Sequence, residues 1–428
     1  MRTSNSKPSR RDGRGGRDSR RPEPRPHPTA PARAAGSRAV PCPHFPRCVG
    51  CPLVGTAYAE QLASKDARLR EALAEDAQLA AAIIDDPVGS PEPFGYRNQA
   101  KLVFRTRYVP PDRREVLLGV YRPGTHSVAP ADGCIVHHPR LRPLLHTLRD
   151  EVERLAMPVY DERVRTGALR YALVRTATAQ PEVHLTLVSA VADPPQLDEL
   201  LCRLRRAHPE LTATYLCVNP TPGNTILSPD IRLLHGSGAL LERFGALALE
   251  SRPDAFLQAN SAVAAQIYAT ACDWLEPRAS DVALDLYCGV GALALHLAPH
   301  VARVVGVEAQ PAAVACAVAN ATRAGAANVA FVAATVEDTP RVIAAQALGA
   351  VDLCAVNPPR KGLSAAGVEM LAATSPRRVV YVSCDPCTLA RDLSLLAKRG
   401  YRLDRVRAFD MLPQTPHVEA VALLVRSD

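Results

Sequence analysis

Hydrophobic and polar positions follow three successive patterns along this chain of 428 residues. From residue 254 onward, short apolar runs alternate with segments of helical spacing, such as 311–324 and 388–398. Strands are predicted at 282–286, 304–307, 329–332, 353–356, 379–383, 401–409 and 418–425. Because alternating strands and helices build a parallel sheet with helices on both faces, residues 251–428 are predicted to form an α/β domain with a Rossmann-like, seven-stranded sheet.

The middle of the chain has a different pattern, in which short β-type runs are broken by Pro and Gly. These runs lie at 101–109, 114–124, 170–178, 182–190, 214–220 and 224–228, and a helical stretch lies at 194–208. Residues 93–250 are therefore predicted to form a central α+β domain. Before it, a cysteine-rich segment begins at residue 41, and apolar residues at helical spacing predict one helix over 58–83.

Charge is concentrated at the N-terminus. Residues 1–40 hold eleven of the 51 Lys and Arg side chains and three of the 43 Asp and Glu side chains, so the rest of the chain is balanced. This segment is rich in Arg, Gly, Pro and Ser and is predicted to be a disordered basic tail. A mobile polycation binds phosphates without sequence preference, which favours a nucleic-acid partner. A merely solubilising extension is the alternative.

Cysteine usage and hydropathy indicate the cellular setting. No uncharged apolar run approaches about 18 residues, so no membrane contact is expected. The Arg-rich N-terminus has no apolar stretch after it, so a cytoplasmic protein is expected. In that compartment twelve cysteines favour metal or catalytic roles over disulfides. Three of them, Cys42, Cys48 and Cys51, lie close together in a spacing that suits zinc as well as an iron–sulfur cluster.

A cofactor-binding turn is predicted after the strand 282–286. The segment from Asp285 to Gly291 holds two glycines that permit a tight turn, but the third glycine of a dinucleotide fingerprint is missing. Glu308 ends the next strand, 23 residues after Asp285, where a carboxylate can accept hydrogen bonds from both ribose hydroxyls of a nucleoside. The pair favours S-adenosyl-L-methionine (SAM) over NAD. A structural turn with a surface glutamate is the alternative.

Chemistry is predicted at the ends of three further strands. The loop Asn357-Pro-Pro-Arg360 carries Arg360 where an aromatic residue would favour methylation of an exocyclic amine. Cys384 directly follows the strand 379–383, and Glu419 lies at the start of the last strand. A thiolate that adds to C6 of uracil makes C5 nucleophilic, and a general base must then remove the C5 proton. A cysteine and a glutamate at neighbouring strand ends suit this reaction.

Purely structural roles are the alternative for these residues. Cys384 could be a buried structural thiol, and the glutamate could be structural as well. Cys387 is expected to be a bystander on the following helix, and His417 is expected to be an exposed loop residue.

Five segments together resemble the RNA uracil-5 methyltransferases. These are DAFLQAN (254–260), DLYCGVGALAL (285–295), VNPPRKG (356–362), VSCDP (382–386) and FDMLPQTPHVEAVAL (409–423). The resemblance covers nearly everything after residue 41. It implies a class I SAM-dependent methyltransferase fold and an enzyme that modifies 23S ribosomal RNA or tRNA.

The resemblance also implies roles for individual residues. SAM contacts are implied for Gln258, Tyr287, Glu308 and Asn357. The nucleophile and the base are implied to be Cys384 and Glu419. In the ribosomal RNA members, four thiolates hold a [4Fe–4S] cluster, and here they would be Cys42, Cys48, Cys51 and Cys134.

Two features of the sequence point to one branch of the family. The residue at 357 is Asn, and no counterpart of the small RNA-binding β-barrel is found, as in the 23S rRNA (uracil-C5)-methyltransferases of the RlmC type. The segment CPHFPRCVGCP looks more like the barrel-bearing branch, so the target uridine stays open. We expect a 23S rRNA enzyme, with tRNA as the second substrate. A cytosine-C5 methyltransferase and a non-catalytic RNA-binding assembly factor are the remaining alternatives, and no protein partner is implied.

Overall fold

A computed structural model describes residues 42–427 except residue 224. The predicted basic tail, 1–40, lies outside the described residues. Two sheets and a short hairpin account for the strands of the described part. No described helix combines the length and the hydropathy that a membrane span requires.

The larger sheet has eight strands in the order β1-β16-β17-β15-β14-β11-β12-β13. Strands β11 to β15 run parallel to one another, whereas β17 is antiparallel to both of its neighbours. The strands are β1 (Ile83–Val88), β11 (Val282–Leu286), β12 (Arg303–Glu308), β13 (Val329–Ala333), β14 (Leu353–Val356), β15 (Arg378–Ser383), β16 (Tyr401–Phe409) and β17 (Glu419–Arg426). Every strand predicted from the C-terminal pattern is present.

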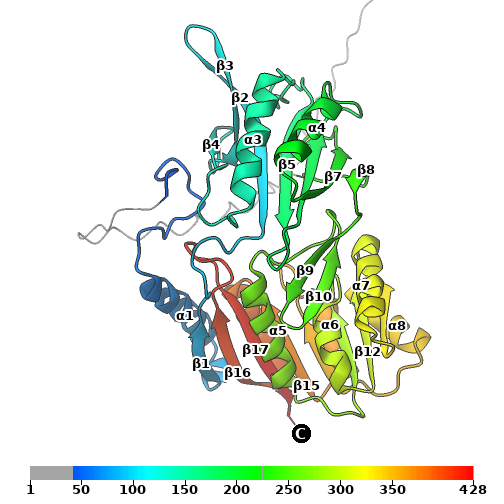
Figure 1. Ribbon diagram of the computed structural model, residues 1–428. Helices are drawn as coiled ribbons and strands as arrows, with labels where there is room; N and C mark the ends of the chain where they lie inside the picture. The colour runs from blue at the N-terminus through cyan, green and yellow to red at the C-terminus, as the bar shows by residue number, and fades with distance from the viewer. Residues whose placement is uncertain (1–41, 224, 428) are drawn as a thin grey trace, which may run out of the picture. The chain divides into compact units, whose positions relative to one another are not determined.

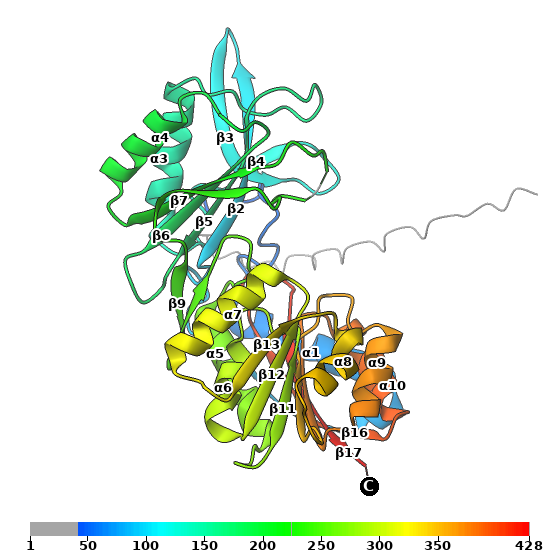
Figure 2. The same cartoon turned by 90° about the vertical axis from the view of Figure 1, so that its right-hand side faces the viewer.

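Helices cover both faces of this sheet, as Figure 2 shows. One face carries α5 (Ser261–Leu275), α6 (Ala292–Leu297) and α7 (Pro311–Ala324); the other carries α1 (Tyr58–Ala74), α2 (Ala77–Ala80), α8 (Thr339–Ala345), α9 (Ala365–Thr374) and α10 (Pro386–Ala397). Two short 3-10 helices span Ala298–His300 and Val336–Asp338. Alternate residues of a strand point to opposite faces, so Ala283 belongs to the hydrophobic cluster that contains α5 and α6, and Leu284 belongs to the cluster that contains α9 and α10.

The N-terminal part of this layer differs from the prediction. A single helix over 58–83 is wrong, because α1 ends at Ala74 and Asp76 caps a new short helix by accepting a hydrogen bond from the Gln78 amide at 2.9 Å. Ile83 then begins β1, which pairs in parallel with β16. The sheet therefore has eight strands rather than the predicted seven.

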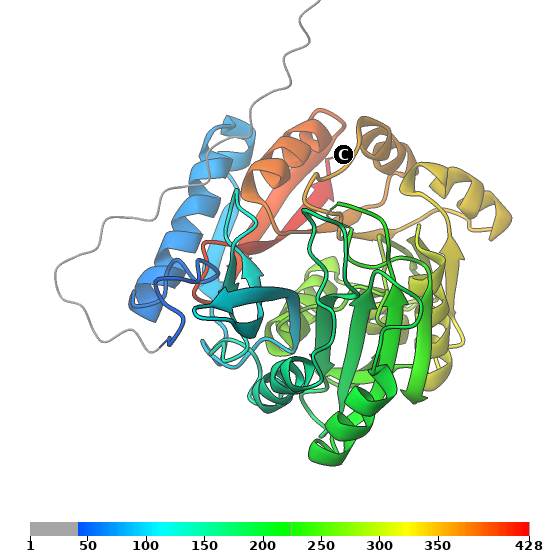
Figure 3. The same ribbon diagram turned by 90° about the horizontal axis from the view of Figure 1, so that it is seen from above.

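The smaller sheet has seven strands in the order β4-β3-β2-β5-β6-β7-β8. Only β6 and β7 are parallel, and helix α4 connects them. Helices α3 and α4 cover the same face, as Figure 3 shows from above. The elements are β2 (Gln99–Val109), β3 (Arg113–Tyr121), β4 (Val128–Pro130), α3 (Leu141–Arg154), β5 (Leu169–Thr176), β6 (Val183–Ser189), α4 (Leu197–Ala207), β7 (Leu211–Val218) and β8 (Ile231–Gly236); β9 (Leu240–Phe244) and β10 (Leu247–Ser251) form a separate hairpin.

The strand predicted at 224–228 is also wrong. The side chain of Asn219 donates hydrogen bonds to the carbonyls of Thr225 and Ile226 at 2.8 and 3.0 Å. Those carbonyls are no longer free for a ladder, so residues 225–228 form a loop and the strand begins at Ile231.

The order of the larger sheet reverses beside β11. Strand β12, which is labelled in Figure 1, lies on one side of β11, and β14 lies on the other. Because the three strands are parallel, their carboxyl ends meet at one edge of the sheet. Such a switch point is the usual place for a ligand in an open α/β sheet. The turn after β11 and the loop after β14 both begin there.

Candidate active site

A cleft of about 470 Å³, including space open to solvent, lies at the switch point. It is lined by Phe244, Phe256, Leu257, Gln258, Tyr268, Asp285, Tyr287, Cys288, Gly289, Val290, Ala292, Leu293 and Asn357. Three of the four residues predicted to contact SAM are therefore brought together there. The fourth, Glu308, lies directly behind the lining, since its carboxylate accepts a hydrogen bond from the Gly289 amide at 3.2 Å.

The turn after β11 has a backbone that few residues allow. Tyr287, Gly289 and Gly291 all have positive φ, at 60°, 55° and 87°. A Cβ atom on Gly291 would stand 2.5 Å from the ring of Phe331, so only glycine fits. Glu308 also accepts a hydrogen bond from the Gln310 amide at 2.8 Å and thereby joins the turn to the start of α7.

Asp285 is a buried carboxyl group at the floor of the cleft. One of its oxygens accepts a hydrogen bond from the Ala294 amide at 2.9 Å, and the other oxygen has no hydrogen-bond partner among the described residues. Burial, with a further contribution from the nearby charge of Glu308, raises the pKa of Asp285 to about 7. A buried acceptor without a partner is costly, so the site favours a ligand that brings a hydrogen-bond donor.

Gln258 and Asn357 reach the cleft from different elements. The carbonyl of Gln258 accepts a hydrogen bond from the Asn98 side chain at 2.9 Å, which fixes the segment before α5. The Asn357 amide donates to the Leu286 carbonyl at 3.2 Å, which ties the end of β14 to the end of β11. The start of α5 therefore positions Gln258, and the end of β14 positions Asn357.

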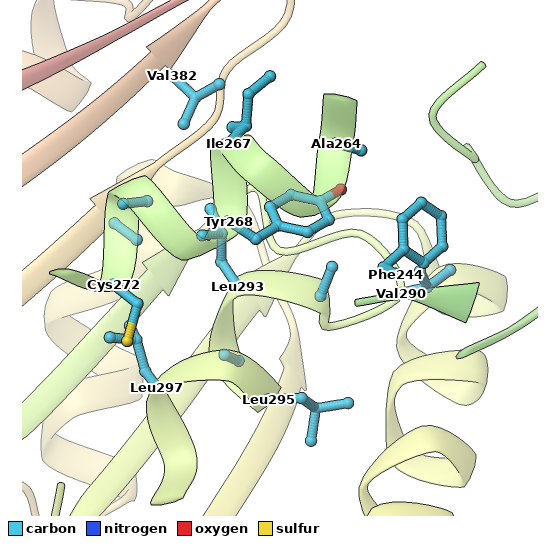
Figure 4. Packing of buried hydrophobic residues seen from close by; sticks show 14 of the residues in the cluster. Phe244, Ala264, Ile267, Tyr268, Cys272, Val290, Leu293, Leu295, Leu297 and Val382 are labelled. Carbon is cyan, nitrogen blue, oxygen red and sulfur yellow. The ribbon is translucent and has the colours of Figure 1, made fainter. Parts of the chain in front are cut away.

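Three aromatic side chains of the lining, Phe244, Phe256 and Tyr268, were not predicted as site residues. Figure 4 shows Tyr268 on α5 near Phe244 and Val290, and the two ring centroids lie 5.9 Å apart. Phe256 lines the same cleft and is 69 % exposed. An exposed phenylalanine beside a cleft is available for stacking against a ligand, yet in the sequence it looks like any other apolar residue.

Cys384 and Glu419 face each other across two paired strands. Ser383 of β15 is the partner of Ala420 of β17, so Cys384 leaves one strand where Glu419 enters the other. Burial raises the pKa of Glu419 to about 7. Burial and then the charge of Glu419 raise the pKa of the Cys384 thiol. The arrangement supplies a thiol and a carboxylate that can hold a proton near neutral pH.

The helix after Cys384 fixes its backbone. Asp385 caps α10 by accepting a hydrogen bond from the Thr388 amide at 2.9 Å, and Pro386 takes the first helical position. Cys387 lies on this helix with its side chain exposed, and His417 is exposed as well. Both positions agree with their predictions.

Arg360 has a neighbourhood that the sequence did not reveal. Its guanidinium lowers the pKa of Cys384, by its charge and by a hydrogen bond, and its charge also lowers the pKa of Glu419. The loop that carries it is anchored by buried Asp392, which accepts hydrogen bonds from the Leu363 amide at 2.7 Å and the Tyr381 hydroxyl at 2.6 Å. The cation therefore favours the ionised forms of both predicted catalytic groups.

The four cysteines predicted to hold a cluster are electrostatic neighbours. Burial and then the charges of Cys134, Cys48 and Cys42 raise the pKa of Cys51 to about 12. Across residues 42–427 without 224, however, no three His, Cys, Asp or Glu side chains stand as ligands of a metal ion would. The thiols gather in one place, but their geometry is not that of a metal centre.

Residues 246–427 match the family described as tRNA (uracil-5-)-methyltransferase. An uncharacterised RNA methyltransferase of Geobacter sulfurreducens is 34% identical over 90% of this chain and 77% of its own length. One of Thermosynechococcus vestitus is 35% identical over 92% of this chain and 86% of its own length.

Among solved structures, the chain is similar to the Pyrococcus abyssi tRNA (uracil-54, C5)-methyltransferase in complex with S-adenosyl-L-homocysteine. The TM-score is 0.70 at 27% identity, and the match covers 89% of this chain and 86% of that one. That complex contains the demethylated product of SAM. The match extends well beyond residues 246–427, so the resemblance is not confined to the C-terminal domain.

Proposed function

The chain belongs to the RNA uracil-5 methyltransferase family, and on that premise we propose that it methylates C5 of a uridine in 23S ribosomal RNA through a covalent bond to Cys384. The observation that carries the proposal is the facing pair of Cys384 and Glu419, with Arg360 beside both. SAM is the methyl donor of such enzymes. A cytosine-C5 enzyme and a binding factor without activity become outcomes of the test.

Each of these groups has one task in the proposed reaction. The Cys384 thiolate, favoured by Arg360, bonds to C6 of the uracil ring, and electron density moves to C5. C5 then takes the methyl group that bound SAM supplies. Glu419 removes the C5 proton, the C5–C6 double bond re-forms and the thiolate leaves. A carboxyl with a pKa near 7 holds that proton well at the pH of the cell.

The cleft provides a consistent place for SAM. We assign Gln258, Tyr287, Glu308 and Asn357 to SAM binding. Tyr287 and Asn357 line the cleft, and Glu308 stands at the end of β12, where it can accept from ribose hydroxyls. The unpartnered oxygen of Asp285 offers one more acceptor for a donor on the ligand.

We also propose that the four gathered thiols hold a [4Fe–4S] cluster. Burial and then the neighbouring thiols raise the pKa of Cys51, and a soft metal centre would stabilise all four thiolates in this place. The proposed ligands are Cys42, Cys48, Cys51 and Cys134. The reaction above transfers no electrons, so no step of it depends on the cluster.

The first experiment measures tritium release from RNA labelled at uridine C5, with purified protein and SAM. Release from 23S rRNA and not from tRNA supports the proposal as stated. Release from tRNA alone would favour the second candidate, which rests on the match to tRNA (uracil-5-)-methyltransferases. If neither RNA releases tritium while SAM binds, the C5 chemistry is wrong.

A further inference from the structure

Most of the loop that carries Glu419 to its position is buried, although it has no regular structure and His417 is exposed. Residues 410–418 connect β16 to β17, and Asp410, Met411, Gln414 and Thr415 are at most 8 % exposed. The buried backbone polar groups of such a loop need hydrogen-bond partners within the protein.

Those partners come from residues 53–96, far away in the sequence. Four carbonyls of the loop accept hydrogen bonds from that segment: Leu412 from the Lys65 ammonium at 3.1 Å, Pro413 from the Tyr96 hydroxyl at 3.0 Å, Gln414 from the Leu53 amide at 3.1 Å, and Pro416 from the Arg68 guanidinium. The N-terminal segment therefore serves as a template for this loop.

Gln61 makes the most specific of these contacts. Its side-chain oxygen accepts from the Gln414 amide at 2.9 Å, and its side-chain nitrogen donates to the Gln414 side chain at 3.0 Å. Gln414 has φ +68°, a strained value for any residue but glycine. Such a conformation persists only where the surroundings hold it, and Gln61 and Leu53 bond to both sides of this residue.

A buried ion pair fixes the other end of the loop. Lys65 and Asp410 are 1 % and 0 % exposed, and the ammonium bonds directly to the carboxylate. Buried charges are costly unless they are paired with good geometry, so this pair specifies one arrangement of helix and loop. Gln61, Lys65 and Arg68 are spaced at i, i+4 and i+7 on one face of α1.

We propose that Gln61 and Lys65 on α1 are positioning residues for the base, which hold the 410–418 loop so that Glu419 meets the C5 proton. The proposal rests on the proposed function, because it assumes that Glu419 is the base. Both residues act on the base through the loop, because their side chains bond to Asp410, Leu412 and Gln414. The expected defect is therefore confined to proton removal and enzyme release.

The test uses Gln61→Met, which keeps the side-chain volume and removes the hydrogen bonds. With methyl-labelled SAM and the RNA that the wild type modifies, we expect a normal first turnover followed by about 10-fold slower steady-state turnover. The methylated protein–RNA adduct should accumulate on a denaturing gel, and the Kd of SAM should not change.

The matched control is Asn328→Leu, which removes two similar amide hydrogen bonds, to the Ala298 and Val301 carbonyls at 2.8 and 3.0 Å. This control should lose stability without adduct accumulation. If Gln61→Met keeps the wild-type ratio of first to later turnovers, the positioning role is wrong. If the wild type forms no adduct and releases no tritium, the proposed function itself has failed.

Discussion

Two regions of this molecule gather thiols, and they do so by different means. Cys384 stands where β15 ends, opposite the start of β17, and its partners Glu419 and Arg360 come from neighbouring strand ends. Cys42, Cys48, Cys51 and Cys134 are brought together by two segments without regular structure, one at 42–51 and one around Cys134. One thiol has a cation beside it, whereas the four thiols chiefly face one another.

The comparison shows that the fold alone positions Cys384, whereas the four loop thiols would need a bound metal to fix their arrangement. A thiol at a strand end is positioned by backbone hydrogen bonds and by the capped helix α10, so it is ready to react without a metal. Thiols on loops have no such frame and repel one another once ionised. A bound metal would supply both the missing charge and the missing geometry.

The sharpest test of this contrast is Cys384→Ala, matched with Cys387→Ala three residues away. We expect Cys384→Ala to lower turnover by about 10⁴-fold or more and to abolish covalent RNA adducts, because no other group can add to C6. Cys387→Ala, on the exposed side of α10, should stay within about twofold of the wild type. Tritium release and denaturing gels measure both. Residual turnover of Cys384→Ala above background would remove the assignment.

Loss of one loop thiol should affect metal content rather than chemistry. We expect anaerobically purified protein to hold about four irons per chain, and Cys51→Ser to hold almost none. The control is Cys202→Ser, an exposed cysteine on α4, which should keep its iron. Metal analysis and the visible absorption spectrum measure this. Stoichiometric zinc in the wild type, or no metal at all, would contradict the cluster.

Glu308, at the end of β12, tests whether a strand-end residue also positions the proposed SAM site. Glu308→Ala removes the acceptor for the Gly289 and Gln310 amides and the proposed ribose contact. We expect the Kd of SAM to rise about 10- to 100-fold, which corresponds to about 1.4–2.8 kcal/mol. Titration calorimetry measures it. Glu250→Ala breaks the exposed pair with Arg323 and should leave the Kd unchanged, so equal effects of the two would refute the assignment.

The same contrast explains what the sequence could predict. Strands β11 to β17 are marked by apolar runs, and the pairing of β15 with β17 places the predicted Cys384 and Glu419 opposite each other. Strand β1 was missed because Asp85, Asp86 and Pro87 interrupt its pattern. This edge strand depends on a partner more than 300 residues away, where Arg405 pairs with Asp85 at 2.9 Å.

The positioning residues show a second limit. A lysine on a helix is normally solvated, and nothing near Lys65 in the sequence indicates that it is buried. Its partner Asp410 is 345 residues further along the chain. Arg360 likewise appeared only as a missing aromatic residue, since its neighbours Cys384 and Glu419 are known only after folding. Local patterns indicate elements and motifs, whereas these pairings depend on the tertiary structure.

The smallest expected effect is on the free energy of unfolding, which the burial of Glu419 lowers. Its pKa is raised by burial from 4.5 to about 7, so the folded state binds its proton more tightly than the unfolded state does. Stability is therefore lost as the pH rises from about 4.5 to 7, and the loss persists above that range.

Glu419→Gln removes this ionisation. At pH 8 we expect the free energy of unfolding of the variant to exceed that of the wild type by on the order of 2 kcal/mol. At pH 4.5 the two free energies of unfolding should be about equal. Urea unfolding of the SAM-free protein at both pH values measures the difference, and Asp285, which also titrates near pH 7, is the same in both proteins. Because the base must be ionised to act, wild-type turnover should rise through pH 7 as stability falls. An equal difference at both pH values would show that burial does not raise the pKa of Glu419, and the strand-end site would then carry no such cost.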